Sequence, residues 1–112
     1  MTEQISTTGD RITPVFDLPL HHRVQAVRVD YEPGGTTAWP HRHPYGAFVY
    51  VIDGSVRMAV EGAAAQVLRA GDSFHEAPGA LHTVSENASD TDPASLLAVF
   101  VLPEGHEATV GA

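Results

Sequence analysis

The residues of this chain that could do chemistry are its histidines, and two of them stand close together. His41 and His43 are separated by one residue within the stretch from Gly35 to Gly54. Alternate side chains of a β-strand point to the same face, so in an extended segment both imidazoles can contact one metal ion. The run FVYVI that follows is β-branched and aromatic, which favours a strand. Seven histidines in 112 residues can produce such a pair by chance, so the pair alone is weak evidence of a metal site. A second observation is needed.

That second observation is the segment GDSFHEAPGALH, which runs from Gly71 to His82. It has turn residues at its start, a short strand candidate, a Pro-Gly turn and a final histidine. Together with the first stretch it resembles the paired motifs of the cupin family, G-x5-H-x-H-x3-E-x6-G and G-x5-P-x-G-x2-H-x3-N. The resemblance covers residues 23–103, which is most of the chain.

The chain departs from these motifs at three positions. Ala47 stands where the first motif has its glutamate, and Ala77 and Glu86 stand where the second has its proline and asparagine. The positions that match are Gly35, His41, His43, Gly54, Gly71, Gly79 and His82.

The resemblance implies an all-β fold: a single antiparallel cupin β-barrel of the jelly-roll type. The residue pattern agrees independently, because it predicts several short strands separated by turns and shows no helical stripe. The predicted domain is residues 13–103, including an N-terminal arm at 13–22, and residues 1–12 and 104–112 are predicted to be flexible tails. The clearest strand candidates are residues 23–31, 46–52, 55–60, 73–76 and 94–102.

The resemblance also implies that His41, His43 and His82 bind a divalent transition metal. Three neutral imidazoles suit zinc, and iron, copper, nickel or manganese as well. The usual cupin site adds a carboxylate, which Ala47 cannot supply. Some cupin dioxygenases, such as those acting on cysteine, gentisate and acetylacetone, resemble this chain in using three histidines without it. The alternative is that the histidines are remnants in a cupin that binds its ligand without metal.

Other residues are candidates for the same site. Glu76 could replace the missing carboxylate or serve as a catalytic base, or it could be solvated or paired with an arginine. Tyr45 is a candidate catalytic residue, and Trp39 a candidate for the pocket wall, because odd positions share one face of a continuous strand. Both are equally good packing residues. His75 is predicted to lie on the surface or the pocket wall.

The implied function is a metal-dependent, oxygenase-type enzyme, a dioxygenase-like oxidoreductase acting on a small organic molecule. The alternatives are a non-redox isomerase, cyclase or lyase, and a non-catalytic cupin that binds or senses a small molecule. Because three neutral histidines leave a divalent ion its full charge, the substrate is expected to be anionic and bidentate. This argument fails if Glu76 reaches the ion and restores the negative charge.

Composition excludes several other classes of protein. The chain has neither cysteine nor lysine, which removes disulfides, thiolate nucleophiles and Schiff-base catalysis. A net charge of −8 and scattered arginines argue against nucleic-acid binding. The sequence has no apolar run of membrane-spanning length and no signal-peptide pattern, so a cytoplasmic protein is expected. A homodimer is also expected, with the arm at 13–22 as the contact, because barrel edge strands need cover.

Overall fold

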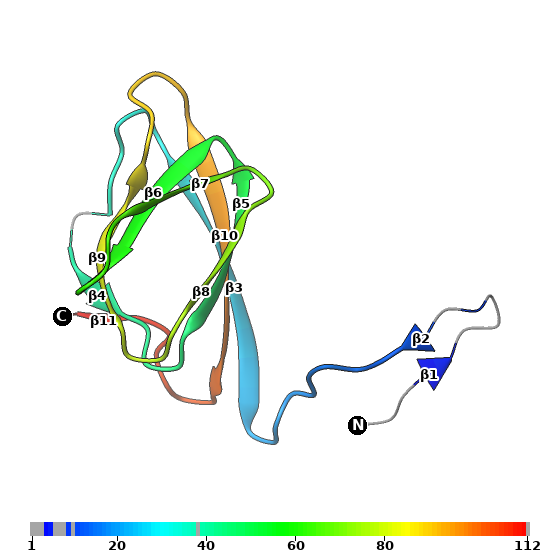
Figure 1. Cartoon of the computed structure of the whole chain (residues 1–112). Coiled ribbons are helices and arrows are strands. Elements are labelled where there is room, and N and C mark those ends of the chain that lie inside the picture. The colour runs from blue at the N-terminus through cyan, green and yellow to red at the C-terminus, as the bar shows by residue number, and fades with distance from the viewer. Residues whose placement is uncertain (1–3, 6–8, 10, 38, 112) are drawn as a thin grey trace.

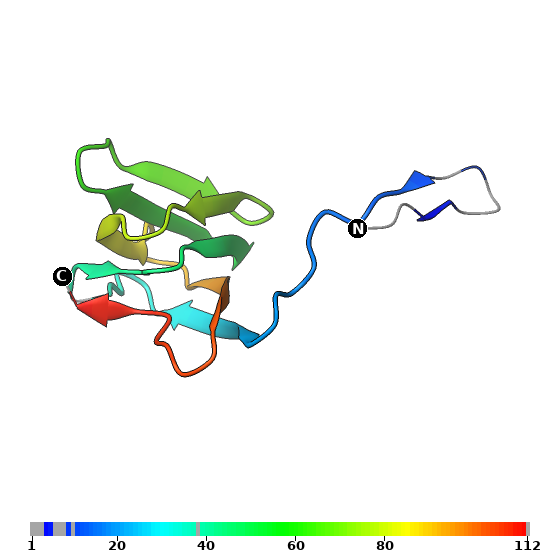
Figure 2. The same cartoon turned by 90° about the horizontal axis from the view of Figure 1, so that it is seen from below.

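In the computed structural model of the protein, a barrel is formed by two antiparallel sheets that face each other (Figures 1 and 2). The structure describes residues 4–5, 9, 11–37 and 39–111. One sheet has the strand order β3 (His22–Tyr31), β10 (Ala94–Pro103), β5 (Ala47–Asp53) and β8 (Ser73–Glu76). The other has the order β11 (Val110–Gly111), β4 (His41–Arg42), β9 (Leu81–Asn87), β6 (Ser55–Val60) and β7 (Gln66–Arg69). The predicted all-β, antiparallel jelly-roll fold is confirmed.

The core lies between the two sheets and follows from strict alternation along the strands. In β5, Ala47, Val49 and Val51 are buried, whereas Phe48 and Tyr50 point outward. A one-residue slip would reverse both faces, so this alternation fixes the register of β5 against β10. Each fully buried valine or leucine contributes roughly 1.5–3 kcal/mol relative to exposure. The buried apolar side chains from the remaining strands include Val56, Met58, Leu96, Phe100 and Leu102.

A glycine carries the chain from one sheet to the other. Gly46 has a φ of 80°, in the left-handed region that glycine adopts without strain. It lies between β4 in the five-stranded sheet and β5 in the four-stranded sheet. A Cβ at this position would lie 2.8 Å from the backbone oxygen of Glu76, so the close approach of β5 to β8 also requires glycine.

The N-terminal segment extends away from the barrel, whereas the C-terminal segment pairs with it. Near the N-terminus, β1 (Gln4–Ile5) pairs with β2 (Arg11–Ile12), and residues 13–20 extend away from the barrel (Figures 1 and 2). At the other end, within the segment 104–112 predicted to be a flexible tail, β11 pairs with β4 through Val110 and Gly111. Among the described residues no helix is long and apolar enough to cross a membrane.

Candidate metal centre

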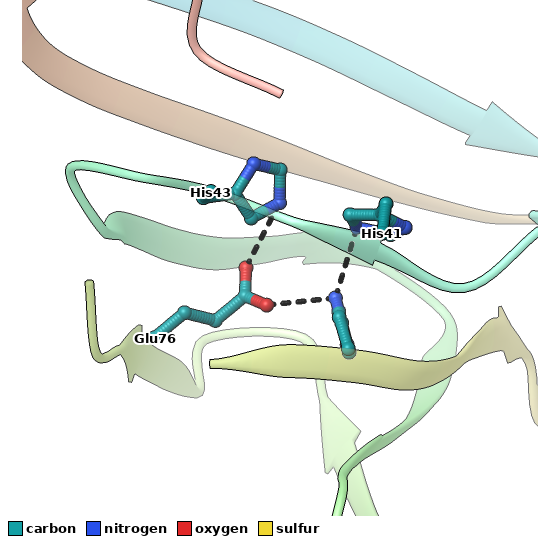
Figure 3. Close-up of side chains that lie close together, drawn as sticks. His41, His43 and Glu76 are labelled. Carbon is teal, nitrogen blue, oxygen red and sulfur yellow. Dashed lines mark hydrogen bonds and ion pairs between the residues drawn. The ribbon is translucent and has the colours of Figure 1, made fainter. Parts of the chain in front are cut away.

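Four side chains from three strands and one turn meet between the sheets. His41 lies on β4, His43 directly follows this strand, and Glu76 ends β8 (Figure 3). His82 lies on β9. One ligand atom from each of the four lies within 4.8 Å of the others. The predicted histidines are therefore brought together, and Glu76 joins them.

The pairing of strands explains this convergence. His41 and His82 are directly opposed in the β4–β9 ladder, so their rings share a face. Glu76 is directly opposed to Ala47 in the β5–β8 ladder. Position 47 is where the cupin motif has its glutamate, so the carboxylate reaches the same region of the barrel from the neighbouring strand. Sequence reasoning raised this role for Glu76 without being able to derive the pairing.

The backbone around the site orients two of the imidazoles. His43 Nδ1 lies 3.0 Å from the carbonyl oxygen of Ala108 and 3.0 Å from Thr109 Oγ1. His41 Nδ1 lies 3.3 Å from the carbonyl oxygen of Trp39. A carbonyl only accepts, so Nδ1 of each ring carries the proton and Nε2 keeps its lone pair for the centre of the cluster.

Glu76 lies between two of the histidines. Its Oε1 lies 2.7 Å from His82 Nδ1, which can donate to it, and its Oε2 lies 3.4 Å from His43 Nε2, which in the neutral ring is a second acceptor (Figure 3). Only 3% of Glu76 and 2% of His82 is exposed to solvent. A buried carboxylate is costly unless it is paired, so this one depends on its imidazole neighbours or on a cation between them.

Burial is the main influence on the protonation of His41. Desolvation lowers its pKa below the ordinary value of 6.5, and the neighbouring His82 and His43 lower it further. The Trp39 carbonyl and the Glu76 carboxylate act in the opposite direction but do not cancel the effect. The His41 ring therefore stays neutral, the form that binds a metal, to lower pH than a free histidine.

The cluster fits a divalent transition metal. Three imidazole nitrogens and one carboxylate oxygen are a donor set that zinc and other first-row metals accept. His82 Nδ1 lies 3.2 Å from His41 Nε2, so two nitrogens face each other where a cation would satisfy both. Within the described part of the chain, the buried His82 Nε2 also has no hydrogen-bond partner. An orphaned buried nitrogen costs about 1–3 kcal/mol and is typical of a functional site.

The cluster opens into a cavity of about 360 Å³. Its walls are mainly apolar, and its polar lining includes the four cluster side chains, which is the usual composition of a small-molecule site. Phe100 packs against His43 with ring centroids 5.0 Å apart. Other wall residues are Val27, Val29, Val49, Leu96, Trp39 and Thr109.

The structure places Tyr45 away from this cavity. The strand that the sequence suggested is interrupted at residues 43–46, so the alternation that would bring Tyr45 inward is lost. Its hydroxyl instead hydrogen-bonds His106 Nδ1 near the surface. Trp39 does line the cavity, although 80% of it is exposed. His75 is exposed on β8 and points away from the cluster, because it alternates with Glu76.

Two residues that sequence reasoning did not consider also belong to the site. Ala108 and Thr109 lie in the segment predicted to be a tail, yet they contact His43 and line the cavity. The only sequence signal nearby is the short apolar pattern ending in Val110. A two-residue strand such as β11 is too short for periodicity to reveal.

Comparison with known proteins identifies the family. The family model described as "Cupin domain" matches residues 27–100, well over half of the chain. The chain therefore belongs to the cupin family, as the two histidine motifs indicated.

The chain is similar to a curated protein and to solved structures over part of their length. The chain is 38% identical over 72 residues to the (R)-mandelonitrile lyase of Granulicella tundricola, covering 64% of this chain and 54% of that protein. It thus spans about half the length of this curated relative. Among solved structures, an oxalate oxidase in complex with the substrate analogue glycolate is 27% identical, with a TM-score of 0.64, covering 80% of this chain and 46% of that one.

A cupin-like protein from Thermotoga maritima has a TM-score of 0.66 at 23% identity and covers 80% of this chain and 64% of that one. At this identity the likeness shows the fold alone. It agrees with the all-β architecture described above.

Proposed function

We propose that this cupin is a metal-dependent lyase that cleaves a small α-hydroxy compound, such as a hydroxynitrile, into a carbonyl compound and a small acid. The observation that carries the proposal is the buried Glu76 carboxylate beside three histidines at the end of a mainly apolar cavity. The identity of 38% to an (R)-mandelonitrile lyase supports the reaction class. A lyase therefore replaces an oxygenase as our leading candidate for the function.

His41, His43, Glu76 and His82 would hold the metal. A bound divalent ion would supply Lewis-acid polarisation of the substrate oxygen. Three of the four ligands are neutral, and Glu76 returns one negative charge from β8. The expectation of an anionic substrate rested on the absence of that charge. A neutral α-hydroxy group is therefore an equally suitable ligand.

Glu76 would accept the substrate's hydroxyl proton. A carboxylate has two oxygens, so it can give one to the ion and keep the other as a proton acceptor. The O–H electron pair then forms the carbonyl double bond. The bond to the nitrile carbon breaks, and its electron pair leaves with cyanide. Return of the proton from Glu76 to cyanide gives hydrogen cyanide and regenerates the site.

The cavity suits a substrate with one apolar group. About 360 Å³ is at the lower end of the range for small-molecule sites. Val27, Val49 and Phe100 would surround an aryl or alkyl group, while the cluster holds the polar end. Trp39 both lines the cavity and is exposed to solvent, so substrate and products would pass beside it.

The test is anaerobic turnover of racemic mandelonitrile by metal-loaded protein, with benzaldehyde release followed by absorbance. We expect release without oxygen, its loss in Glu76→Gln and His82→Ala, and its retention in His75→Ala. His75 is a matched control because it neighbours Glu76 on β8 but points away from the cluster. Failure of the metal-loaded protein to release benzaldehyde would refute a lyase acting on this compound.

A second candidate is an oxidase or oxygenase acting on a small α-hydroxy carboxylate. The likeness to an oxalate oxidase bound to glycolate favours it, because glycolate carries a hydroxyl next to a carboxylate. An oxygen electrode with glycolate and related acids distinguishes the two classes. Oxygen uptake that matches substrate loss would establish the oxidoreductase and displace the lyase.

A further inference from the structure

A second polar group lines the cavity, distinct from the metal cluster: the hydroxyls of Tyr31, Thr37 and Ser85. The Tyr31 Oη lies 2.7 Å from Thr37 Oγ1 and 2.8 Å from Ser85 Oγ. Tyr31 and Ser85 are each 7% exposed, whereas Thr37 is exposed to solvent. The backbone N–H of Thr37 donates to the Ser85 carbonyl oxygen at 2.8 Å, which holds Thr37 beside β9. We call these three residues the hydroxyl cluster.

A bulge in β9 places the hydroxyl cluster on the same cavity wall as His82. In the β6–β9 ladder the register shifts between Ala59 and Val60, which leaves Thr83 as an extra residue on β9. Residues three apart normally point to opposite faces of a strand, and the extra residue corrects this. His82 and Ser85 therefore both line the cavity. Three extended residues rise roughly 10 Å, so this distance along β9 separates the hydroxyl cluster from the metal cluster.

The hydroxyl cluster has one more proton than it needs for its own hydrogen bonds. Each hydroxyl donates once, and two hydrogen bonds join the three oxygens, so one proton is left to donate elsewhere. An unpaired donor is most costly on a buried residue, so Ser85 donates to Tyr31, and Tyr31 donates to Thr37. Thr37, which is exposed and lines the cavity, then has the free proton. Hydrogen bonds that run in one direction along such a chain strengthen the last donor.

We infer that Thr37 is a specificity-determining residue whose hydroxyl donates to a neutral oxygen at the far end of the substrate, with Tyr31 and Ser85 as its positioning residues. The inference rests on the proposed lyase function. A span of roughly 10 Å requires a substrate whose α-hydroxy group lies at the metal cluster and whose second oxygen follows a spacer of about one aryl ring. The expected class is an aryl hydroxynitrile with an ether or carbonyl oxygen at the para position of the ring.

The charge of the cavity favours a neutral oxygen over a carboxylate at this end. The chain has no lysine, and none of the described residues that line the cavity is an arginine. A carboxylate would lose part of its hydration without gaining a cation, and one hydroxyl does not offset that cost. An ether or carbonyl oxygen only exchanges a hydrogen bond from water for one from Thr37.

Binding of two aldehydes of nearly equal size tests this hydrogen bond apart from catalysis. An oxygen in para-methoxybenzaldehyde stands where para-ethylbenzaldehyde has a methylene group, and both are products of the corresponding hydroxynitriles. Each is titrated into the full chain, with and without added zinc, and binding is followed by NMR. We expect the methoxy compound to bind roughly two- to tenfold more tightly, the range for one neutral hydrogen bond. Equal affinity, or no binding of either compound, would overturn the inference.

Substitutions at position 37 identify the donor. Thr37→Val is nearly isosteric but lacks the hydroxyl, so the preference for the methoxy compound should disappear while binding of the ethyl compound is retained. Thr37→Ser retains the hydroxyl and should retain the preference. Thr36→Val is the matched control, because Thr36 is exposed and is not among the described residues that line the cavity. A Thr37→Val chain that keeps the preference would overturn the inference.

Tyr31→Phe tests the positioning role, because it leaves Thr37 its hydroxyl but removes the partner that orients it. This variant should lose most of the preference, and a variant that keeps all of it would overturn the role of Tyr31.

Turnover of the para-methoxy and para-ethyl hydroxynitriles separates this inference from the proposed function. If neither is cleaved but the binding preference holds, the lyase proposal fails and the role of Thr37 stands. If both are cleaved with equal kcat/KM and both aldehydes bind equally, the lyase proposal stands and the role of Thr37 is overturned.

Discussion

Moving the carboxylate of the site from β8 to β5 tests the assignment of Glu76. Ala47 and Glu76 are directly opposed in the β5–β8 ladder and are 4% and 3% exposed. Directly opposed residues have Cβ atoms about 4.5–5.5 Å apart and share a face. Glu76→Ala removes the carboxylate, and adding Ala47→Glu returns it at the position where the cupin motif has it. We expect the first change to weaken metal binding and the second to restore it.

The magnitude follows from the position of Glu76 in the cluster. Residues that only support metal ligands typically cost 10–100-fold in affinity when removed. Glu76 offers a ligand atom that lies within 4.8 Å of those of the three histidines, so its loss should cost about 100-fold or more in metal affinity, roughly 2.7 kcal/mol. The metal affinity of the double variant should recover to within about tenfold of that of the natural chain. Ala47→Glu alone places a second carboxylate beside Glu76 and should destabilise the metal-free protein by roughly 3–5 kcal/mol.

The assay is competition with a coloured chelator for metal affinity, with chemical denaturation of the metal-free protein in parallel. His75→Ala is the control and should match the natural chain in metal affinity and in the stability of the metal-free protein. If Glu76→Ala binds metal as tightly as the natural chain, the three histidines alone are the ligands and Glu76 only accepts from His82. If the double variant folds but its metal affinity does not recover, a carboxylate at position 47 cannot take the place of Glu76.

Three further predictions concern the histidines. His82→Ala should lose most of its metal, measured by elemental analysis after dialysis, and unchanged metal content would remove His82 from the ligand set. Thr109→Val keeps the branched shape but removes one hydrogen bond to His43 Nδ1, so metal affinity should fall by up to about tenfold. Equal affinity would mean that the Ala108 carbonyl alone is sufficient to orient the His43 ring. In the metal-free protein, His41 should titrate below 6.5 in a ring-nitrogen NMR titration. Because its folded-state pKa is lowered, His41 contributes nothing to stability well above pH 6.5, and the free energy of unfolding should fall as pH drops below 6.5. A midpoint at or above 6.5 would contradict the effect of burial.

The sequence predicted the part of the site that is local in the chain. His41 and His43 are two residues apart, and His82 ends a motif with its own glycines, so a pattern of fixed spacing finds all three. Glu76 could only be suggested as a ligand, because its role depends on which strand pairs with β5. The spacing of residues in the sequence does not reveal strand pairing. A signal was present nevertheless: an alanine in the place of the motif's glutamate, and a glutamate on the same strand face as Phe74.

Two features of the site lie beyond what strand periodicity can predict. Tyr45 became a candidate for the cavity wall because a strand was extended through a point where the chain changes sheets. Gly46, with its positive φ, marks that change. Likewise, the contact between His43 and Ala108 joins segments 65 residues apart in the chain. Such a contact forms because β11 pairs with β4, and two residues of strand carry too little pattern to predict it.

The relocated carboxylate bears on which reaction the site favours. With Glu76 on β8, a bound ion would have the same set of ligand charges as in the usual cupin site. Its Lewis acidity would therefore not by itself distinguish a lyase from an oxidase. What differs is the direction from which the carboxylate approaches. It reaches the cluster from β8, through His82 and His43, while Ala47, directly opposed to it on β5, contributes only a methyl group. A substrate hydroxyl bound beside the cluster would have Glu76 as its proton acceptor, and proton removal is the step that starts carbon–carbon cleavage. On this reasoning, crowding Glu76 with Ala47→Leu should reduce turnover of a hydroxynitrile far more than it reduces metal content, because the three histidines are unchanged, a difference that turnover and elemental analysis of the same preparation would measure.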